Sequence, residues 1–320
     1  MAFKDIRGQV FPIARLQGEL KNNHLAGAYL FSGPEGLGKK LVAFNFAKAL
    51  NCLESKTDAC DSCISCRKIE NKQHPDIHIL DAGRFEEIKI DDIRTLQQEI
   101  VLRPYEARFK VFIINDAHNL NAESANAFLK TLEEPPKSSV IILVTDKPRM
   151  LFRTIISRCQ NVKFSALGQN EFEQVLRNGY NIDERTLRFL SFFCEGRIGS
   201  AIAWKDQDII AQKNRVIDFF SSANTANAEN SFIQDRETFR QSLSILAGWF
   251  RDLYFLKAGI NKDRIINIDR SDVLEKLALR YTFNDLESIL NGISQSLLYL
   301  EQNANVKLLL ANLLLSVRKN

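Results

Sequence analysis

The first half of the chain alternates short apolar runs with stretches of helical periodicity. The continuous apolar runs are typical of strands buried on both faces, and the stretches between them space their apolar residues as helices do. This alternation predicts a parallel α/β sheet that ends near residue 164. The predicted strands cover residues 28–32, 77–80, 111–114 and 140–144, and the predicted helices cover residues 41–50, 93–100 and 122–132.

From residue 166 onward, helical periodicity replaces the strand-like runs. It is interrupted at residues 196–199, and the small polar residues at 221–231 predict a loop. Two long helical patterns follow, one over residues 239–256 and a last one through residues 308–314. Both are too apolar to face water all round, which predicts a helical bundle or a packing surface for other subunits.

Composition agrees with a helix-rich globular protein of two or three domains. The 320 residues are 45% hydrophobic and 26% charged, which excludes a wholly disordered chain, and 14 glycines with 7 prolines are few. The net charge of +4 neither establishes nor excludes nucleic-acid binding. The first residues lack the apolar stretch of a signal peptide, and no apolar run approaches 18 residues, so we expect a cytoplasmic protein.

Residues 33–40 read Gly-Pro-Glu-Gly-Leu-Gly-Lys-Lys and match the G-x-x-x-x-G-K phosphate loop. The match lies between a predicted strand and a predicted helix, as its mechanism requires. Gly33, Gly36 and Gly38 let backbone N–H groups surround a phosphate, and Lys39 would reach the terminal phosphates. A fortuitous glycine-rich turn is the alternative.

The residues that should hold magnesium at this loop are replaced. Lys40 stands where a Ser or Thr hydroxyl ligates Mg²⁺, and Asn115 stands at the strand end where a carboxylate belongs, followed by Asp116. We therefore expect no ATP hydrolysis here, against the alternative that water-held Mg²⁺ supports a slow reaction. Whether Lys39 still holds ATP or ADP stays open. Thr145, at the end of the next strand, either faces the phosphate or is an ordinary strand-end hydroxyl.

Four of the six cysteines crowd together with the spacing C-x7-C-x2-C-x2-C: Cys52, Cys60, Cys63 and Cys66. Four thiolates at such short spacing suit a tetrahedral, closed and therefore structural Zn²⁺ site. An iron–sulfur cluster and four unrelated cysteines are the alternatives. Cys159 and Cys194 lie apart and are interpreted as ordinary buried cysteines.

Arg158 is a candidate for contact with a partner. It follows the apolar pair Ile155-Ile156 and lies between Ser157 and Cys159, so buried neighbours can position it with its side chain outward. Taken alone, the pattern is typical of a solvated surface arginine.

Taken together, these segments resemble the bacterial DNA polymerase III clamp-loader subunits of the AAA+ class, and within them the delta-prime branch. The likeness covers nearly the whole chain, and the Asn-Ala-Phe-Leu-Lys-Thr-Leu-Glu-Glu-Pro and Ser-Arg-Cys segments are highly specific. The segments that carry it are residues 3–9, 33–40, 52–66, 74–76, 90–94, 126–136, 157–159 and 249–253.

The resemblance implies an α/β parallel-sheet P-loop (AAA+) domain at 1–164 with a zinc module at 52–66. An all-helical lid at 165–208 and an all-helical collar at 209–320 would follow, with the collar assembling a hetero-pentamer. The implied partners are the gamma/tau ATPase and delta subunits, with the sliding clamp and primer–template DNA met through the assembled complex. Arg158 would be an arginine finger that acts in trans at a neighbour's ATP site. The chain would belong to the polymerase holoenzyme without its own ATPase or polymerase activity.

Two alternative functions compete with this interpretation. A gamma/tau-type ATPase subunit shares the cysteines and the Ser-Arg-Cys segment, but this chain departs from a motor at Lys40, at Asn115 and at Gly199, which stands where a motor carries its sensor arginine. Arg197 lies two positions early. A stand-alone zinc-containing nucleic-acid-binding protein is disfavoured, since residues 52–66 hold few bases and no aromatic platform.

Overall fold

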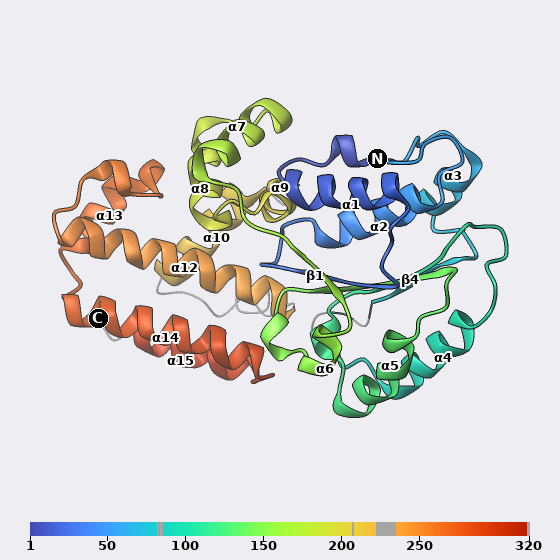
Figure 1. Cartoon of the computed structure of the whole chain (residues 1–320). Helices are drawn as coiled ribbons and strands as arrows, with labels where there is room; N and C mark the ends of the chain where they lie inside the picture. The colour runs from blue at the N-terminus through green and yellow to red at the C-terminus, as the bar shows by residue number, and fades with distance from the viewer. Residues whose placement is uncertain (82, 84–85, 207, 222–234, 319–320) are drawn as a thin grey trace. The chain divides into compact units, whose positions relative to one another are not determined.

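The computed structural model describes the chain except residues 82, 84–85, 207, 222–234 and 319–320 (Figure 1). The chain divides into two compact units. The first unit comprises residues 1–175 and 196–201, and the second unit comprises residues 176–195 and 202–320. Apart from its first residue, which ends a helix, the polar loop predicted at 221–231 lies outside the described residues.

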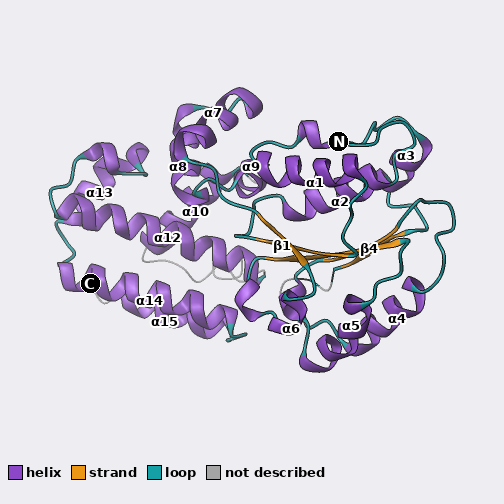
Figure 2. Ribbon diagram, viewed as in Figure 1, coloured by secondary structure: helices purple, strands orange, loops and turns teal. Residues whose placement is uncertain are grey.

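The first unit is built on a parallel sheet, as predicted (Figure 2). In the described chain its order is β2-β3-β4-β1-β5, and every pairing is parallel. The last strand was not predicted, because Val162 is its only buried residue and no apolar run marks it. The strands are β1 (Ala28–Ser32), β2 (Ile77–Leu80), β3 (Lys110–Ile114), β4 (Ser139–Thr145) and β5 (Gln160–Lys163).

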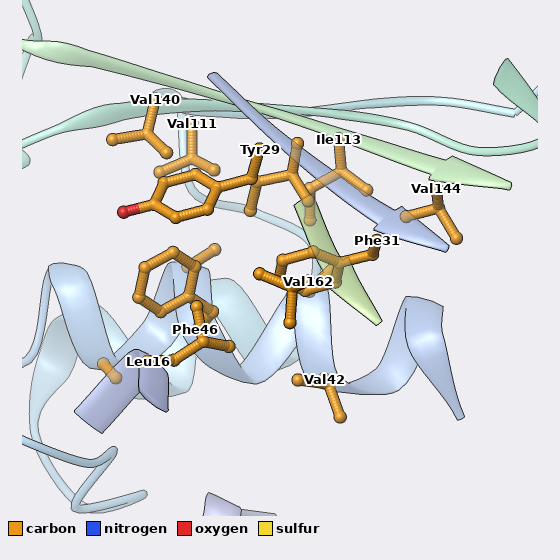
Figure 3. Close-up of a cluster of buried hydrophobic side chains, with 14 of the residues drawn as sticks. Leu16, Tyr29, Phe31, Val42, Phe46, Val111, Ile113, Val140, Val144 and Val162 are labelled. Carbon is orange, nitrogen blue, oxygen red and sulfur yellow. The ribbon is translucent and has the colours of Figure 1, made fainter. Parts of the chain in front are cut away.

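Helices cover both faces of this sheet (Figure 2). Successive strand side chains point to opposite faces, so Tyr29 and Phe31 pack in one core cluster, against Phe46 (Figure 3), while Leu30 packs in the other with Phe128. The first cluster is covered by α1 (Val10–Asn22) and α2 (Lys39–Leu50), and the second by α4 (Ile90–Ile100) and α5 (Ala122–Glu133). The remaining short helices of this unit include α3 (Ile64–Glu70) and α6 (Arg153–Ile156).

The carboxyl ends of the parallel strands meet at one edge, which is where open α/β sheets bind ligands. β1 leads there into the glycine loop, β2 into Asp81, β3 into Asn115 and β4 into Asp146. Residues far apart in sequence are thus brought to the mouth of the phosphate loop.

The rest of the described chain is helical, as predicted. Helix α12 contains the predicted helix 239–256, buries Trp249 and Phe250, and packs against α13 and α14. No helix in the described residues is both long and apolar enough to cross a membrane. These helices are α7 (Gln169–Tyr180), α8 (Glu184–Cys194), α9 (Ile198–Asp206), α10 (Ile209–Ser221), α12 (Arg236–Lys257), α13 (Ser271–Ala278), α14 (Phe283–Glu301) and α15 (Val306–Arg318).

Candidate nucleotide, metal and arginine sites

The phosphate loop has the backbone that its sequence predicts. Gly33, Gly36 and Gly38 have φ of 147°, 73° and 81°. Residues other than glycine adopt such positive values only with strain. Gly38 is the N-cap of α2, so the unpaired N–H groups of the helix's first turn lie at the loop. Such a backbone suits an anion.

Lys39 is buried within this loop. Its Nζ donates hydrogen bonds to the carbonyl oxygens of Gly33 and Pro34, both at 2.7 Å. Burial lowers the pKa of Lys39, and the charges of Asp146 and nearby carboxylates offset this only in part. The ammonium therefore satisfies the loop's own carbonyls, and a phosphate would have to compete with them. Nucleotide binding by Lys39 stays a prediction.

Lys40 and Asn115 stand at the positions expected to ligate magnesium in an ATP-hydrolysing subunit, and both contact Asp81. The Lys40 ammonium forms an ion pair with Asp81, and Asn115 Nδ2 donates to the other carboxylate oxygen of Asp81 at 3.1 Å. Burial raises the pKa of Asp81, but the hydrogen bonds from Lys40 and Asn115 outweigh it and hold that pKa below its usual value. The Lys40 ammonium is thus paired with a carboxylate at the edge of the loop, in a contact that is partly exposed. Asp81 was not identified from the sequence as a site residue, although it directly follows β2, where the ligand-binding edge of the sheet lies.

Thr145 and Asp116 have partners within the protein. The Thr145 side chain is buried, its hydroxyl lies 3.1 Å from His118 Nδ1, and it accepts a hydrogen bond from the N–H of Lys147 at 3.0 Å. Asp116 has φ of 48° and accepts from Asn115 Nδ2 at 3.0 Å. Thr145 is therefore engaged as a strand-end hydroxyl, and its contact with phosphate stays a prediction.

Gly199 touches the phosphate loop directly. Its N–H donates to the carbonyl oxygen of Gly36 at 2.8 Å, and a Cβ built on Gly199 would lie 2.8 Å from the same oxygen. A Cβ on Gly36 would meet Ser200 Oγ at 1.9 Å. No side chain fits between the backbones of Gly36 and Gly199. In this arrangement, position 199 can therefore hold only glycine, and not the sensor arginine expected there in an ATP-hydrolysing subunit.

The four predicted zinc ligands converge. Their Sγ atoms all lie within 4.8 Å of one another, and Cys60 Sγ lies 4.0 Å from Cys66 Sγ. Four sulfurs at the ~2.3 Å zinc–sulfur distance of a tetrahedral site lie about 3.8 Å apart, so a small contraction suffices. The set is Cys52, Cys60, Cys63 and Cys66.

Backbone N–H groups donate hydrogen bonds to three of these sulfurs, and such bonds stabilise thiolates that hold a metal. Cys60 Sγ accepts from Cys63 N at 3.3 Å, Cys63 Sγ from Cys66 N at 3.4 Å, and Cys52 Sγ from Ser55 N at 3.3 Å. Burial raises the pKa of the Cys66 thiol. Burial also acts to raise that of Cys60, but hydrogen bonds from Ser62 and Cys63 outweigh it and lower that pKa to about 7. The residues fit a structural Zn²⁺ held by four sulfurs, a role that supplies stability rather than chemistry.

Polar contacts tie the cysteine cluster to the start of the chain. Lys48 is fully buried, and its Nζ pairs with Asp61 and with Glu70 at 2.6 Å, and donates to Met1 O at 2.9 Å. Asp58 accepts from the N–H of Phe3 at 2.8 Å. Sequence reasoning missed Lys48, because its ion pairs join positions brought together only by the fold.

Arg158 lies at the surface of the first unit, and 30% of its side chain is exposed. Nε donates to Glu133 Oε1 at 2.8 Å, Nη2 pairs with the same oxygen, and Nη1 donates to Thr154 O at 2.8 Å. The buried Ile155 anchors the segment before it, as predicted. Cys159 is partly buried, its pKa raised by burial to about 12, and Cys194 is buried.

Comparison with known proteins gives a consistent result. Residues 8–168 match the family model described as "DNA polymerase III, delta subunit", and residues 209–319 match the one for that subunit's C-terminal part. DNA polymerase III subunit delta' of Bacillus subtilis is 29% identical over 313 residues, which is 95% of this chain and 94% of the relative. The tau subunit of the same organism is 34% identical over 213 residues, 65% of this chain and 38% of its own.

A solved structure, that of a DNA polymerase III gamma subunit-related protein from Thermotoga maritima, has a TM-score of 0.54 at 19% identity. The match covers 96% of this chain and 99% of that one, and it shows the fold alone.

Proposed function

The chain belongs to the DNA polymerase III delta-subunit family, and we propose that it works as a delta-prime-type, non-motor subunit of the clamp loader. In that role it helps load the sliding clamp onto primed DNA during replication. A match that runs the length of both chains supports the delta-prime branch, whereas the tau relative is covered over only 38% of its length. The family membership leaves no support for a stand-alone nucleic-acid-binding protein.

The observation that carries the non-motor proposal is the Lys40–Asp81–Asn115 network. Mg²⁺ binds oxygen ligands and is held in proteins chiefly by carboxylates, but here an ammonium replaces the expected hydroxyl, and a neutral amide bonded to Asp81 replaces the expected carboxylate. The phosphate loop then holds only weakly the metal on which phosphoryl transfer depends. Purified full-length chain should hydrolyse ATP no faster than its Lys39→Ala variant. Turnover clearly above that control would refute the proposal.

The second part of the proposal concerns a neighbour's ATP site. Arg158 is partly exposed, and its planar cation suits the developing charge of a transferring phosphoryl group. In the clamp loader reconstituted with its gamma/tau and delta subunits, Arg158→Ala should slow ATP hydrolysis at the adjoining site by about a thousandfold while the complex still assembles. Single-turnover hydrolysis and size-exclusion chromatography measure the two effects. Unchanged ATP turnover in an assembled complex would show that Arg158 does not act as an arginine finger.

The partners and place in the cell follow from the same role. We propose a hetero-pentamer with the gamma/tau and delta subunits, contact with the clamp and primer–template DNA through that complex, and a cytoplasmic location. Three domains bounded at about residues 164 and 208 remain the proposed division, with a structural Zn²⁺ at 52–66. The chain itself is proposed to lack polymerase activity. Co-purification with the other loader subunits tests this assembly.

A further inference from the structure

The contact between Arg158 and Glu133 joins two segments that lie 25 residues apart. Glu133 Oε1 accepts from Arg158 Nε at 2.8 Å and also pairs with Nη2, so one carboxylate oxygen holds the side edge of the guanidinium. Arg158 Nη1 donates to Thr154 O at 2.8 Å. The guanidinium is thereby held on two sides, by the end of α5 and by a carbonyl of α6.

Both anchors of this contact are firmly packed. Leu132, the residue before Glu133, is 3% exposed, and Ile155, three residues before Arg158, is fully buried. Both belong to the core cluster that α5 forms beneath the sheet, and α5 packs against both α4 and α6. The backbone that carries Glu133 is therefore held firmly relative to the segment that carries Arg158, although the Glu133 side chain itself is 48% exposed.

Among the described residues, the end of the guanidinium fork is the least engaged part of Arg158. An arginine presents five N–H groups in a rigid plane. Glu133 accepts from Nε and Nη2, Thr154 O accepts from Nη1, and Ser157 Oγ accepts a long hydrogen bond of 3.5 Å from Nη1. The second N–H groups of Nη1 and Nη2 form the end of the fork, which is the edge that binds phosphate oxygens in pairs, and a phosphate there would have to replace only the long bond to Ser157.

We propose that Glu133 is a positioning residue for Arg158, holding the side of the guanidinium so that its end edge faces a neighbouring subunit's nucleotide. This inference rests on the proposed finger role of Arg158 and deepens it. Without Glu133, the long arginine side chain must be ordered at each encounter, and a displacement of about 1 Å can cost up to ~100-fold in rate.

Charge alone predicts the opposite effect, which makes the proposal testable. Glu133 is a negative charge beside the phosphates that Arg158 would meet, so removing it should tighten nucleotide binding if electrostatics decided the outcome. A positioning role instead predicts a slower chemical step with nucleotide affinity little changed. Tighter nucleotide binding without slower hydrolysis would therefore indicate the charge effect, and slower hydrolysis at little-changed affinity indicates positioning.

The experiment measures single-turnover ATP hydrolysis and ATP affinity in the reconstituted clamp loader. Glu133→Ala should lower the hydrolysis rate about tenfold at the adjoining site, with affinity within about twofold. Glu133→Gln keeps an acceptor oxygen and should retain an intermediate rate. Glu134→Ala is the matched control, since it removes the same charge one residue away, and should react at the wild-type rate. Wild-type or faster hydrolysis by Glu133→Ala would overturn the proposal.

A double substitution separates positioning from general damage. In the Arg158→Ala background, Glu133→Ala should cause no further loss, because the residue that it positions is already gone. A further loss there would mean that Glu133 acts through the fold, and would also overturn the proposal. If Arg158→Ala alone has no effect, the finger role itself fails; if it slows hydrolysis and Glu133→Ala does not, only the positioning role fails.

Discussion

Helix α2 carries a candidate ligand site at each of its ends, and the two sites differ in what they have kept. At its N-terminus the phosphate loop keeps its backbone, but its magnesium ligands are replaced by the Lys40–Asp81–Asn115 network. Beyond its C-terminus, Cys52 begins a complete set of four converging sulfurs. At the first end two expected magnesium ligands are replaced, and the nearby Asp116, His118 and Asp146 form a group of a different kind, while at the second end all four sulfurs are present.

The phosphate loop keeps its backbone conformation although the residues expected to ligate magnesium are replaced. A Cβ on Gly33 would lie 2.3 Å from Phe164 O, and one on Gly36 would lie 1.9 Å from Ser200 Oγ. These glycines are required by packing whether or not a phosphate ever binds. The cysteines also pack as small apolar residues, since Cys63 and Cys66 share a buried cluster with Ala2 and Ala59, but packing alone does not require four sulfurs close enough together to hold a metal.

The largest effect is expected where the ligand set is complete. Cys66→Ser should reduce bound zinc from about one ion per chain to none and destabilise the fold by about 3 kcal/mol or more, since a structural zinc contributes directly to folding. Elemental analysis and thermal unfolding measure both. Cys159→Ser, outside the cluster, is the control and should keep its zinc. Full zinc occupancy in Cys66→Ser would remove the site.

A smaller effect is expected from the cation that ties α2 to the cysteine cluster. Lys48→Met keeps the length of the side chain but removes the pairs with Asp61 and Glu70, and we expect a loss of about 1–2 kcal/mol in the free energy of unfolding. Chemical denaturation measures it, and hydrogen exchange of residues 1–6 should become faster. Unchanged stability would show that the pairs offset only their own desolvation.

The pH dependence of that loss has a definite sign. Burial acts to lower the pKa of Lys48, but its hydrogen bonds with Asp61 and Glu70 outweigh this and raise it, while the bond from Lys48 lowers the pKa of Asp61 against the effect of burial. The stabilisation is therefore lost as pH falls through the depressed pKa of Asp61, below about 3.9, and as it rises through the raised pKa of Lys48, above about 10.4. Wild type and Lys48→Met should differ most between these limits.

What the sequence could predict depends on how local the signal is. The strands β1, β3 and β4 are buried on both faces, so their apolar runs predicted them directly. The cysteines and the glycine loop each form a short motif, which spacing reveals. β5 has one buried residue and gave no such signal.

The partners of the site residues could not be predicted, for the same reason. Asp81 reaches Lys40 from 41 positions away, and Glu133 reaches Arg158 from 25, so both contacts depend on which strands and helices become neighbours. Each partner does lie at the end of an element, directly after β2 or at the last residue of α5. That position is a usable signal once the sheet order is known.

The smallest expected effect is on nucleotide affinity, in a variant that restores the magnesium ligands at the N-terminal end of α2. Lys40→Thr combined with Asn115→Asp returns a hydroxyl and a carboxylate to a loop whose backbone is intact, and removes the cation that would repel Mg²⁺. The double variant should bind a fluorescent ATP analogue about tenfold more tightly with Mg²⁺ than with a chelator, a difference of about 1.4 kcal/mol. Wild type should show no such difference. Because Lys39 already satisfies the carbonyls of Gly33 and Pro34, the gain has to exceed the loss of those bonds. If Mg²⁺ does not change the affinity of the double variant for the analogue, the bonds of Lys39 within the loop, and not the missing ligands, prevent Mg²⁺-dependent nucleotide binding.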